Sequence, residues 1–289
     1  GIGARVVAVC PTSEEFAAVA AYVRSTDATR RMRVVGIGRV ENDTLLDIFL
    51  AKRGHIIRQC SGPAAQADAS GGFDGMRMER WLFHGPGTPS EAAAGEHPLP
   101  QGGDPLQCII EEGFQPLLAG SRTGAVYGAG TYFARDSAYS DGYARRGADG
   151  TSSIIMARVI LGKYAVGRAG MIQPPLIPGQ GSRHFHSLVN SVECPTIFVV
   201  QDGACAYPAY VITYKHGGRG SKAAAATPSP QSNLVTKGGR ILEADLERLL
   251  GPPPANPVAA RAPKTADSPP TLSMAGVGGG GSSGGGSSA

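Results

Sequence analysis

Hydrophobic residues over the first sixty positions change their spacing in a way that predicts two strand–helix pairs. Residues 5–10 and 32–40 are runs rich in β-branched side chains, which is typical of strands. After the first run, Thr12 and Glu15 have the spacing of a capping box, and apolar residues then recur every three or four positions. The same helical spacing follows the second run over 41–50. This part of the chain is therefore predicted to be strand, helix, strand, helix.

Short apolar strands dominate the middle of the chain. The strands predicted there cover 79–84, 131–134, 152–161, 195–200 and 206–214. Helices are predicted over 104–112 and from Asp136, whose carboxylate can cap a first turn. Pro208 cannot donate a ladder hydrogen bond. We therefore expect either that the last strand is an edge strand or that Pro208 lies among its first residues. Because strands do not alternate regularly with helices, the pattern predicts an α+β fold with antiparallel pairing.

Composition changes toward the C-terminal end, where much of the glycine and proline lies. We expect a strand–helix–strand–helix part over 1–60, a small polar linker over 61–75 and a folded core over 76–216. Residues 217–289 are rich in Gly, Ser, Pro and Ala and are expected to be disordered. Within this tail, 240–250 carries leucines on one face and forms either a small partner-binding helix or a transient helix without a role.

Charge, aromatic content and cysteine spacing narrow the class of protein. The formal net charge is +4 and aromatic residues make up 6%, which does not indicate a dedicated nucleic-acid surface. The five cysteines are widely spaced and contain no CxxC pair, which is typical of free thiols in a reducing compartment, the nucleus, the cytoplasm or both. No apolar run approaches the ~18 residues of a membrane span. The sequence begins with Gly1, so we expect a fragment whose N-terminal targeting signals lie out of view.

The stretch 128–143 combines groups that suit a flat polar heterocycle. Tyr139 and Tyr143 are four residues apart and share one face of a helix or helical turn, with the Ser140 hydroxyl beside them. Tyr132 and two glycines add a further ring and a backbone that permits close approach. The same pattern fits a buried strand and an amphipathic helix whose tyrosines belong to the core, and the stretch alone does not decide between the two.

His84 and Gly85 end a predicted strand and place a donor or acceptor side chain beside a bare backbone. Taken alone, a histidine here is also consistent with a purely structural role. Together with other segments, however, the pair forms part of an ordered series of motifs. These are Leu82-Phe-His-Gly85, Tyr127-Gly-Ala-Gly-Thr-Tyr-Phe-Ala134, Ala138-Tyr-Ser140, Pro195–Val200 and Ala206–Tyr214.

In this order the motifs resemble the catalytic domain of the poly(ADP-ribose) polymerase (PARP) family, and most of all its macrodomain-associated, mono-ADP-ribosylating members. The resemblance implies a PARP-type ADP-ribosyltransferase fold, a split antiparallel β-core with flanking helices and a cleft for NAD+. It makes 76–216 the ADP-ribosyltransferase core and 1–60 the N-terminal part of the same catalytic domain.

The resemblance also implies roles for individual residues toward NAD+, the co-substrate. His84 is expected to hydrogen-bond a ribose hydroxyl, while the backbone of Gly85 and the Ser140 hydroxyl hold the nicotinamide carboxamide. Tyr143 is expected to stack on the nicotinamide ring. Tyr132 is expected to form one wall of the pocket and Tyr139 a second.

His84, Tyr132 and Ile197 take the three positions of the family's signature triad, whose third member is often Glu. Ile197 has no acceptor atom and can neither bond a ribose hydroxyl nor polarise an acceptor hydroxyl. The resemblance therefore implies transfer of one ADP-ribose unit to a protein side chain, on another protein or on this chain itself, with release of nicotinamide.

Three other functions compete with this hypothesis. The chain is either an enzyme or a catalytically inactive PARP-like module that binds a partner or NAD+, and the presence of His84 and Tyr132 favours the enzyme. A nucleic-acid acceptor is permitted by the mild positive charge but not indicated, and Ile197 makes a polymerase the weakest hypothesis. His184 and His186 have no third ligand at metal spacing, so no metal is expected.

Overall fold

The computed structural model describes residues 3–61, 74–87, 103–116 and 125–217. Most of the predicted linker 61–75 lies outside the described residues. The predicted tail 217–289, with its possible helix 240–250, lies outside them apart from its first residue. The division of the chain into these segments therefore stays a prediction.

The described strands form one ten-stranded sheet, and almost every pair in it is antiparallel. Its order is β1 (Arg5–Ala8), β2 (Met32–Glu41), β10 (Ala206–His216), β6 (Ser152–Ile160), β3 (Glu79–His84), β4 (Thr131–Ala134), β9 (Ile197–Val200), β8 (Ser187–Val189) and β7 (Tyr164–Val166), with β5 (Arg145–Arg146) paired to β6. The parallel pair is β7 with β8. The α+β prediction is confirmed.

The sheet is almost divided between β3 and β4. Strand β3 pairs with β6 over its whole length, whereas its pairing with β4 is limited to Phe83 opposite Ala134. The predicted split core thus exists as two halves that remain joined by one residue pair. Beyond this pair, β3 has no ladder partner on the β4 side, although His84 still pairs with Ile155 of β6.

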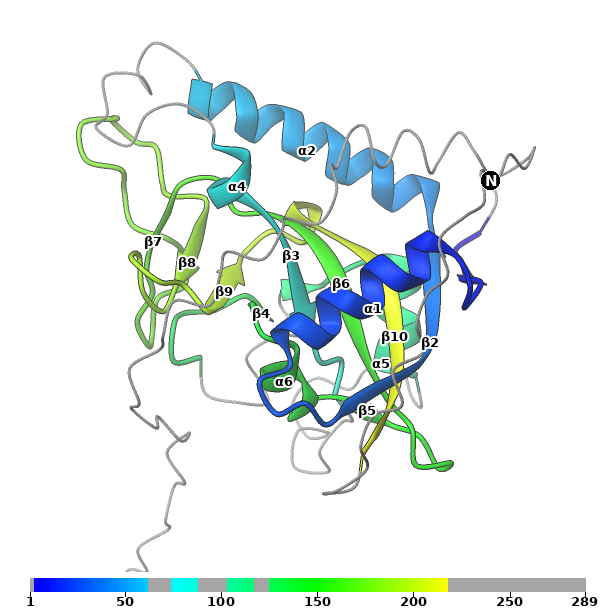
Figure 1. Ribbon diagram of the computed structural model, residues 1–289. Coiled ribbons are helices and arrows are strands. Elements are labelled where there is room, and N and C mark those ends of the chain that lie inside the picture. Colours follow the sequence, from blue (N-terminus) through cyan, green and yellow to red (C-terminus); the bar gives the residue numbers. More distant parts are fainter. Residues whose placement is uncertain (1–2, 62–73, 88–102, 117–124, 218–289) are drawn as a thin grey trace, which may run out of the picture. The chain divides into compact units, whose positions relative to one another are not determined.

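Two long helices pack against the sheet (Figure 1). Helix α1 (Glu14–Thr26) lies across β6 and β10 in this view, and its Tyr22 ring stacks on Phe83 of β3 at 5.6 Å. Helix α2 (Asp43–Ser61) packs Phe49 against Tyr207 of β10. Shorter helices are α4 (Gly75–Met78), α5 (Pro105–Glu112), α6 (Ser137–Asp141) and the 3₁₀ helix η3 (Gly203–Cys205).

Local capping explains where α1 begins, although not as the sequence predicted. The Ser13 hydroxyl, and not that of Thr12, accepts the N–H of Phe16 at 3.1 Å. Thr12 and Ser13 are neighbours at the start of the helix. The course of the backbone there brings the Ser13 hydroxyl to the Phe16 N–H. Asn42 does cap α2, by accepting the N–H of Leu45.

Pro208 lies near the start of a central strand. Strand β10 is bonded to β2 on one side and to β6 on the other, so it is not an edge. The pairing with β6 shifts register between Tyr207 and Tyr210, which removes Pro208 from the ladder. The sequence predicted either an edge strand or a position among the first residues of the strand, and the structure shows the latter.

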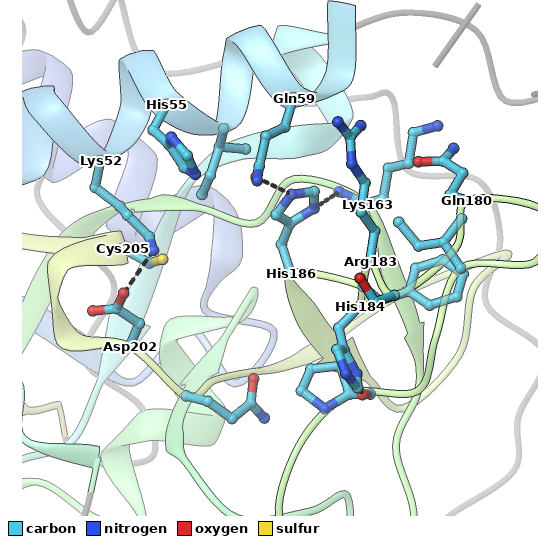
Figure 2. Close-up of a pocket in the computed structure, with 16 residues that line it drawn as sticks. Lys52, His55, Gln59, Lys163, Gln180, Arg183, His184, His186, Asp202 and Cys205 are labelled. Carbon is cyan, nitrogen blue, oxygen red and sulfur yellow. Dashed lines mark hydrogen bonds and ion pairs between the residues drawn. The ribbon is translucent and has the colours of Figure 1, made fainter. Parts of the chain in front are cut away.

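A pocket of about 400 Å³ lies between α2 and the segment 174–186 (Figure 2). Gln59 of α2 faces His186 there, and Lys52 of the same helix points toward Asp202. None of the seven residues predicted for the NAD+ site lines this pocket, as far as the described residues go.

Candidate active site

His84 is the last residue of β3 and lies at the point where the sheet is almost divided. Its Nδ1 is 2.8 Å from the carbonyl oxygen of Tyr132. A carbonyl oxygen can only accept, so Nδ1 carries the hydrogen and donates it. Burial lowers the pKa of His84, although the bond to Tyr132 opposes this, so the ring is neutral at pH 7. Its Nε2 is then an acceptor, and it has no partner among the described residues.

Two phenylalanine rings enclose the imidazole. Phe114 lies edge-on to His84 with ring centroids 5.3 Å apart, and Phe133 lies at 5.6 Å. The two phenylalanines also contact each other at 4.9 Å. No role was predicted for Phe114. The helix-ending Gly113, whose φ of +83° suits glycine, was the available signal that the chain turns inward there.

Tyr132 uses its hydroxyl to hold the turn that precedes β4. This hydroxyl donates to the Gly128 carbonyl oxygen at 2.7 Å and accepts the Tyr127 N–H at 3.0 Å. Burial raises the pKa of Tyr132, so the phenol stays protonated. The Tyr132 side chain is half-buried and shapes the site through its ring and through the turn that it holds.

Gly85 is pressed against the chain that follows α6. A Cβ atom at this position would lie 2.5 Å from the carbonyl oxygen of Ser140 and 2.5 Å from that of Tyr143. The Gly87 N–H also donates to the Tyr143 carbonyl at 2.7 Å. Only glycine allows the end of β3 to come this close, which leaves a cradle of backbone beside the Ser140 side chain.

Helix α6 carries Tyr139 and Ser140, and Tyr143 follows two residues after its end. Ser140 is 3% exposed, and its hydroxyl makes no hydrogen bond with any residue that the structure describes. The Tyr139 and Tyr143 rings are neighbours, with centroids 5.8 Å apart, and both are partly exposed. The predicted cap is wrong: the Asp136 carboxylate does not cap α6 and instead pairs with Arg135.

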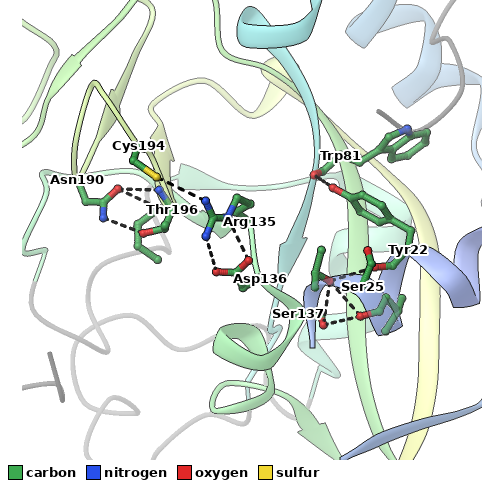
Figure 3. Close-up of polar contacts among 12 residues, drawn as sticks. Tyr22, Ser25, Trp81, Arg135, Asp136, Ser137, Asn190, Cys194 and Thr196 are labelled. Atoms are coloured by element: carbon green, nitrogen blue, oxygen red, sulfur yellow. Dashed lines mark hydrogen bonds and ion pairs between the residues drawn. The ribbon is translucent and has the colours of Figure 1, made fainter. Parts of the chain in front are cut away.

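The start of α6 is fixed by hydrogen bonds to α1 (Figure 3). The Ser137 hydroxyl donates to the Val23 carbonyl oxygen and accepts from Thr26, both at 3.0 Å. All three residues are buried. These bonds join segments more than a hundred residues apart and set the place of Ser140 relative to β3.

The end of α6 is fixed by β10. The Asp141 carboxylate accepts the Tyr214 hydroxyl at 2.5 Å and lies 2.9 Å from Nε2 of His216. Arg146 forms a third, longer contact with the same carboxylate. The sequence analysis assigned no such role to Asp141, because its partners come from distant strands.

Ile197 opens β9 and is 6% exposed. It pairs with Ala134, which in turn pairs with Phe83, so it lies in the cross-strand row that joins the two halves of the sheet. Its N–H donates to the Asn190 side chain, which also holds Thr196 (Figure 3).

The structure thus gathers all seven predicted residues around the junction of β3 and β4. His84 and Tyr132 are hydrogen-bonded, Gly85 touches the backbone of Ser140 and Tyr143, and Ile197 lies one strand beyond Tyr132. The site offers the acceptor Nε2 of His84, the buried hydroxyl of Ser140, the backbone of Gly85 and several aromatic rings. These groups suit a ligand that combines a flat ring bearing an amide with a sugar bearing hydroxyls. The individual roles toward NAD+ stay predictions.

No three His, Cys, Asp or Glu side chains within 3–61, 74–87, 103–116 and 125–217 lie close enough to hold one ion. In that same part of the chain, no helix has both the length and the apolar character needed to cross a bilayer.

Comparison with known proteins agrees with this geometry. The family model of the poly(ADP-ribose) polymerase catalytic domain matches residues 13–216. The human protein mono-ADP-ribosyltransferase PARP12 is 32% identical over 178 residues, which are 62% of this chain and 21% of that protein. The mouse protein mono-ADP-ribosyltransferase PARP10 is 30% identical over 217 residues, which are 73% of this chain and 20% of that protein. The chain therefore spans about a fifth of these relatives.

Proposed function

Because the chain belongs to the poly(ADP-ribose) polymerase catalytic-domain family, we propose that it is an NAD+-dependent mono-ADP-ribosyltransferase. It moves one ADP-ribose unit from NAD+ to a protein side chain. The observation that carries this proposal is the His84–Tyr132 hydrogen bond, which leaves a neutral, unpaired Nε2 beside the cradle of Gly85 and Ser140. The names of the relatives, protein mono-ADP-ribosyltransferases, support the same reaction.

The reaction breaks the bond between the nicotinamide nitrogen and C1 of the ribose. Nicotinamide leaves with the electron pair of that bond, and positive charge develops on the sugar, as in glycoside cleavage. The nucleophilic atom of an acceptor side chain then bonds to C1. If that atom carries a proton, the proton is released. The protein accelerates such a step mainly by holding the reacting groups in place and by stabilising the developing charge.

The residues at the β3–β4 junction supply groups for this positioning. Nε2 of His84 accepts a hydrogen bond from a ribose hydroxyl. The Gly85 backbone and the Ser140 hydroxyl bind the carboxamide, which offers one acceptor and two donors. Tyr143 stacks on the ring, and Tyr132 and Tyr139 form the walls.

Ile197 supports a single transfer over chain extension. Its side chain has no polar atom and is buried, and the resemblance assigns it to the position at which polymerising members of the family carry a carboxylate. Without an acceptor atom it cannot polarise a ribose hydroxyl for a second addition. A carboxylate on the target protein supplies the missing negative charge instead.

The acceptor is a protein, including this chain itself, and the compartment is the nucleus or the cytoplasm. All five cysteines are free, which supports a reducing environment. Fractionation of cells that express the tagged full-length protein tests the compartment, and recovery from the secretory pathway would contradict it.

The transfer is tested by incubating the chain with labelled NAD+ and reading the products by gel and mass spectrometry. We expect discrete single ADP-ribose additions on the chain or on an added protein. His84→Ala should lower the rate about 100-fold or more while the protein still melts cooperatively. His55→Ala, which removes an exposed histidine of α2, is the matched control and should keep the wild-type rate.

Two results would contradict the proposal in different ways. A high-mass ladder would mean that another group polarises the acceptor and that Ile197 does not limit the product. A folded chain that neither labels nor binds NAD+ would favour the inactive, partner-binding module.

A further inference from the structure

The pocket between α2 and the segment 174–186 is separate from the candidate active site. It is lined by four parts of the chain: one face of α2, Lys163 between β6 and β7, the segment 174–186, and the residues that follow β9. Lys52, His55 and Gln59 project into it from α2, and His184 and His186 approach from the other side (Figure 2). Its volume of about 400 Å³ is within the usual range for sites that hold small molecules.

The lining carries an excess of positive charge. Lys52, Lys163 and Arg183 line the pocket together with one carboxylate, Asp202, so the described lining residues have two positive charges in excess. Lys52 is paired with Asp202 at 2.7 Å. The Arg183 guanidinium, at the exposed rim, makes no ion pair or hydrogen bond with a described residue. The pocket therefore favours an anion.

The hydrogen bonds of His186 fix the orientation of a neighbouring amide. Its Nδ1 accepts the Lys163 N–H at 3.0 Å, so its hydrogen is on Nε2 and is donated to the Gln59 oxygen at 3.0 Å. Burial lowers the pKa of His186 to about 4, which keeps this arrangement at neutral pH. The amide nitrogen of Gln59 is consequently a donor, and it has no partner among the described residues.

Two further amide atoms are buried without any partner. The Gln180 nitrogen is a donor and the Gln201 oxygen an acceptor, and neither makes a hydrogen bond within the described residues. The orientation of Gln201 is settled because its nitrogen donates to the Ala129 carbonyl oxygen at 3.0 Å. Leaving a buried polar atom unpaired is unfavourable, so these two atoms call for a bound molecule that completes the site.

We propose that this pocket binds the phosphate ester of a sugar or a similar polyol. Gln59 offers a donor from α2, and Gln180 and Arg183 offer donors from the segment 174–186, which suits the several acceptor oxygens of a phosphate group. The Gln201 oxygen requires a donor, which a phosphate dianion lacks and a sugar hydroxyl provides. The same Gln201 holds the Ala129 carbonyl in the turn that precedes Tyr132, so the ligand touches a residue that bears on the candidate active site.

The test measures binding by calorimetry, so its outcome is independent of transferase activity. Ribose 5-phosphate is titrated into the full chain, with ribose and inorganic phosphate as separate titrants. We expect saturable binding of ribose 5-phosphate, no binding of ribose, and inorganic phosphate at least about ten-fold weaker. Raising the salt concentration should weaken the binding.

Variants localise the site. Arg183→Gln removes the unpaired cation at the exposed rim and should weaken ribose 5-phosphate about ten-fold, as should Gln180→Leu. Arg24→Gln, which changes an exposed arginine of α1, is the matched control and should bind like the wild type. Unchanged affinity in Arg183→Gln, equal binding of ribose or of inorganic phosphate, or no saturable binding at all would overturn the proposal.

Discussion

At His84, one ring nitrogen is used by the fold and the other remains for a ligand. The Nδ1 hydrogen satisfies the Tyr132 carbonyl at the point where the ladder between β3 and β4 stops. The side chain thus takes the place of a backbone donor and fixes its own tautomer. A histidine is suited to this position because it can donate from one nitrogen and accept at the other.

Gly85 offers a direct test of the close approach behind the proposed carboxamide site. Gly85→Ala places a Cβ 2.5 Å from two backbone carbonyl oxygens, so the chain around α6 must shift. We expect NAD+ affinity to fall about ten-fold or more, measured by calorimetry. The control is Gly54→Ala in α2, where the nearest atom is the end of the Arg58 side chain at 3.4 Å. That variant should bind NAD+ normally, and equal affinities would remove Gly85 from the site.

The Tyr132 hydroxyl is predicted to matter through the turn that it holds. Tyr132→Phe leaves the Gly128 carbonyl and the Tyr127 N–H without this partner, which should lower the free energy of unfolding by about 1–3 kcal/mol. The rate of transfer should fall with it. Tyr127→Phe removes a hydroxyl that has no partner among the described residues of the same turn. Urea unfolding and initial rates compare the two, and equal effects would show that the turn does not depend on Tyr132.

Strand β3 is the element that positions His84. It carries His84 at its end and a network of ion pairs at its start. Glu79 is buried and accepts from Arg53 and Arg158, both at 2.9 Å. Arg158 also lies over the Trp81 ring at 5.1 Å. Burial lowers the pKa of Arg158, and the Glu79 carboxylate opposes this shift.

Breaking this network should destabilise the protein severely. Glu79→Ala leaves a buried arginine without its carboxylate, and we expect the free energy of unfolding to fall by about 3–5 kcal/mol. The control is Glu14→Ala, an exposed position in the first turn of α1, with an expected loss below about 1 kcal/mol. Urea unfolding measures both. A loss below about 1 kcal/mol in Glu79→Ala would mean that the network does not stabilise β3.

On the scale of the folded core, two histidines link stability to pH. Burial lowers the pKa of His84, and it lowers that of His186 to about 4. In the unfolded chain both take up a proton near pH 6.5. Between about pH 6.5 and 4 the unfolded state therefore binds more protons than the folded state, so stability is lost as the pH falls through this window.

The melting temperature should accordingly be lower at about pH 5 than at about pH 7.5. His186→Gln keeps a donor and an acceptor but cannot take up the proton, so the difference between the two pH values should shrink. His55→Gln, in the same pocket but exposed, should retain the wild-type difference. An identical difference in all three proteins would exclude His186 as a source of the pH dependence.

The local pattern of the sequence predicted most elements, and the resemblance to the family proposed the residues of the site. Apolar spacing predicts the strands and helices because each depends on neighbours within a few residues, and the ordered motifs bring His84, Tyr132 and Ser140 into one hypothesis. The cap predicted for α1, Thr12, was wrong, because the backbone path brings the Ser13 hydroxyl to the N–H of Phe16.

What only the tertiary structure decided depends on partners distant in sequence. The sequence alone does not show that β10 lies inside the sheet, between β2 and β6. Nor does it show that the Tyr132 hydroxyl hydrogen-bonds the turn before β4, or that Tyr214 donates to Asp141. The pocket between α2 and the segment 174–186 is the clearest case, because Gln59, Gln180 and Gln201 come from three separate stretches and form no motif. Each of these features follows from strand register and long-range packing, which a local pattern of hydrophobic and polar residues does not encode.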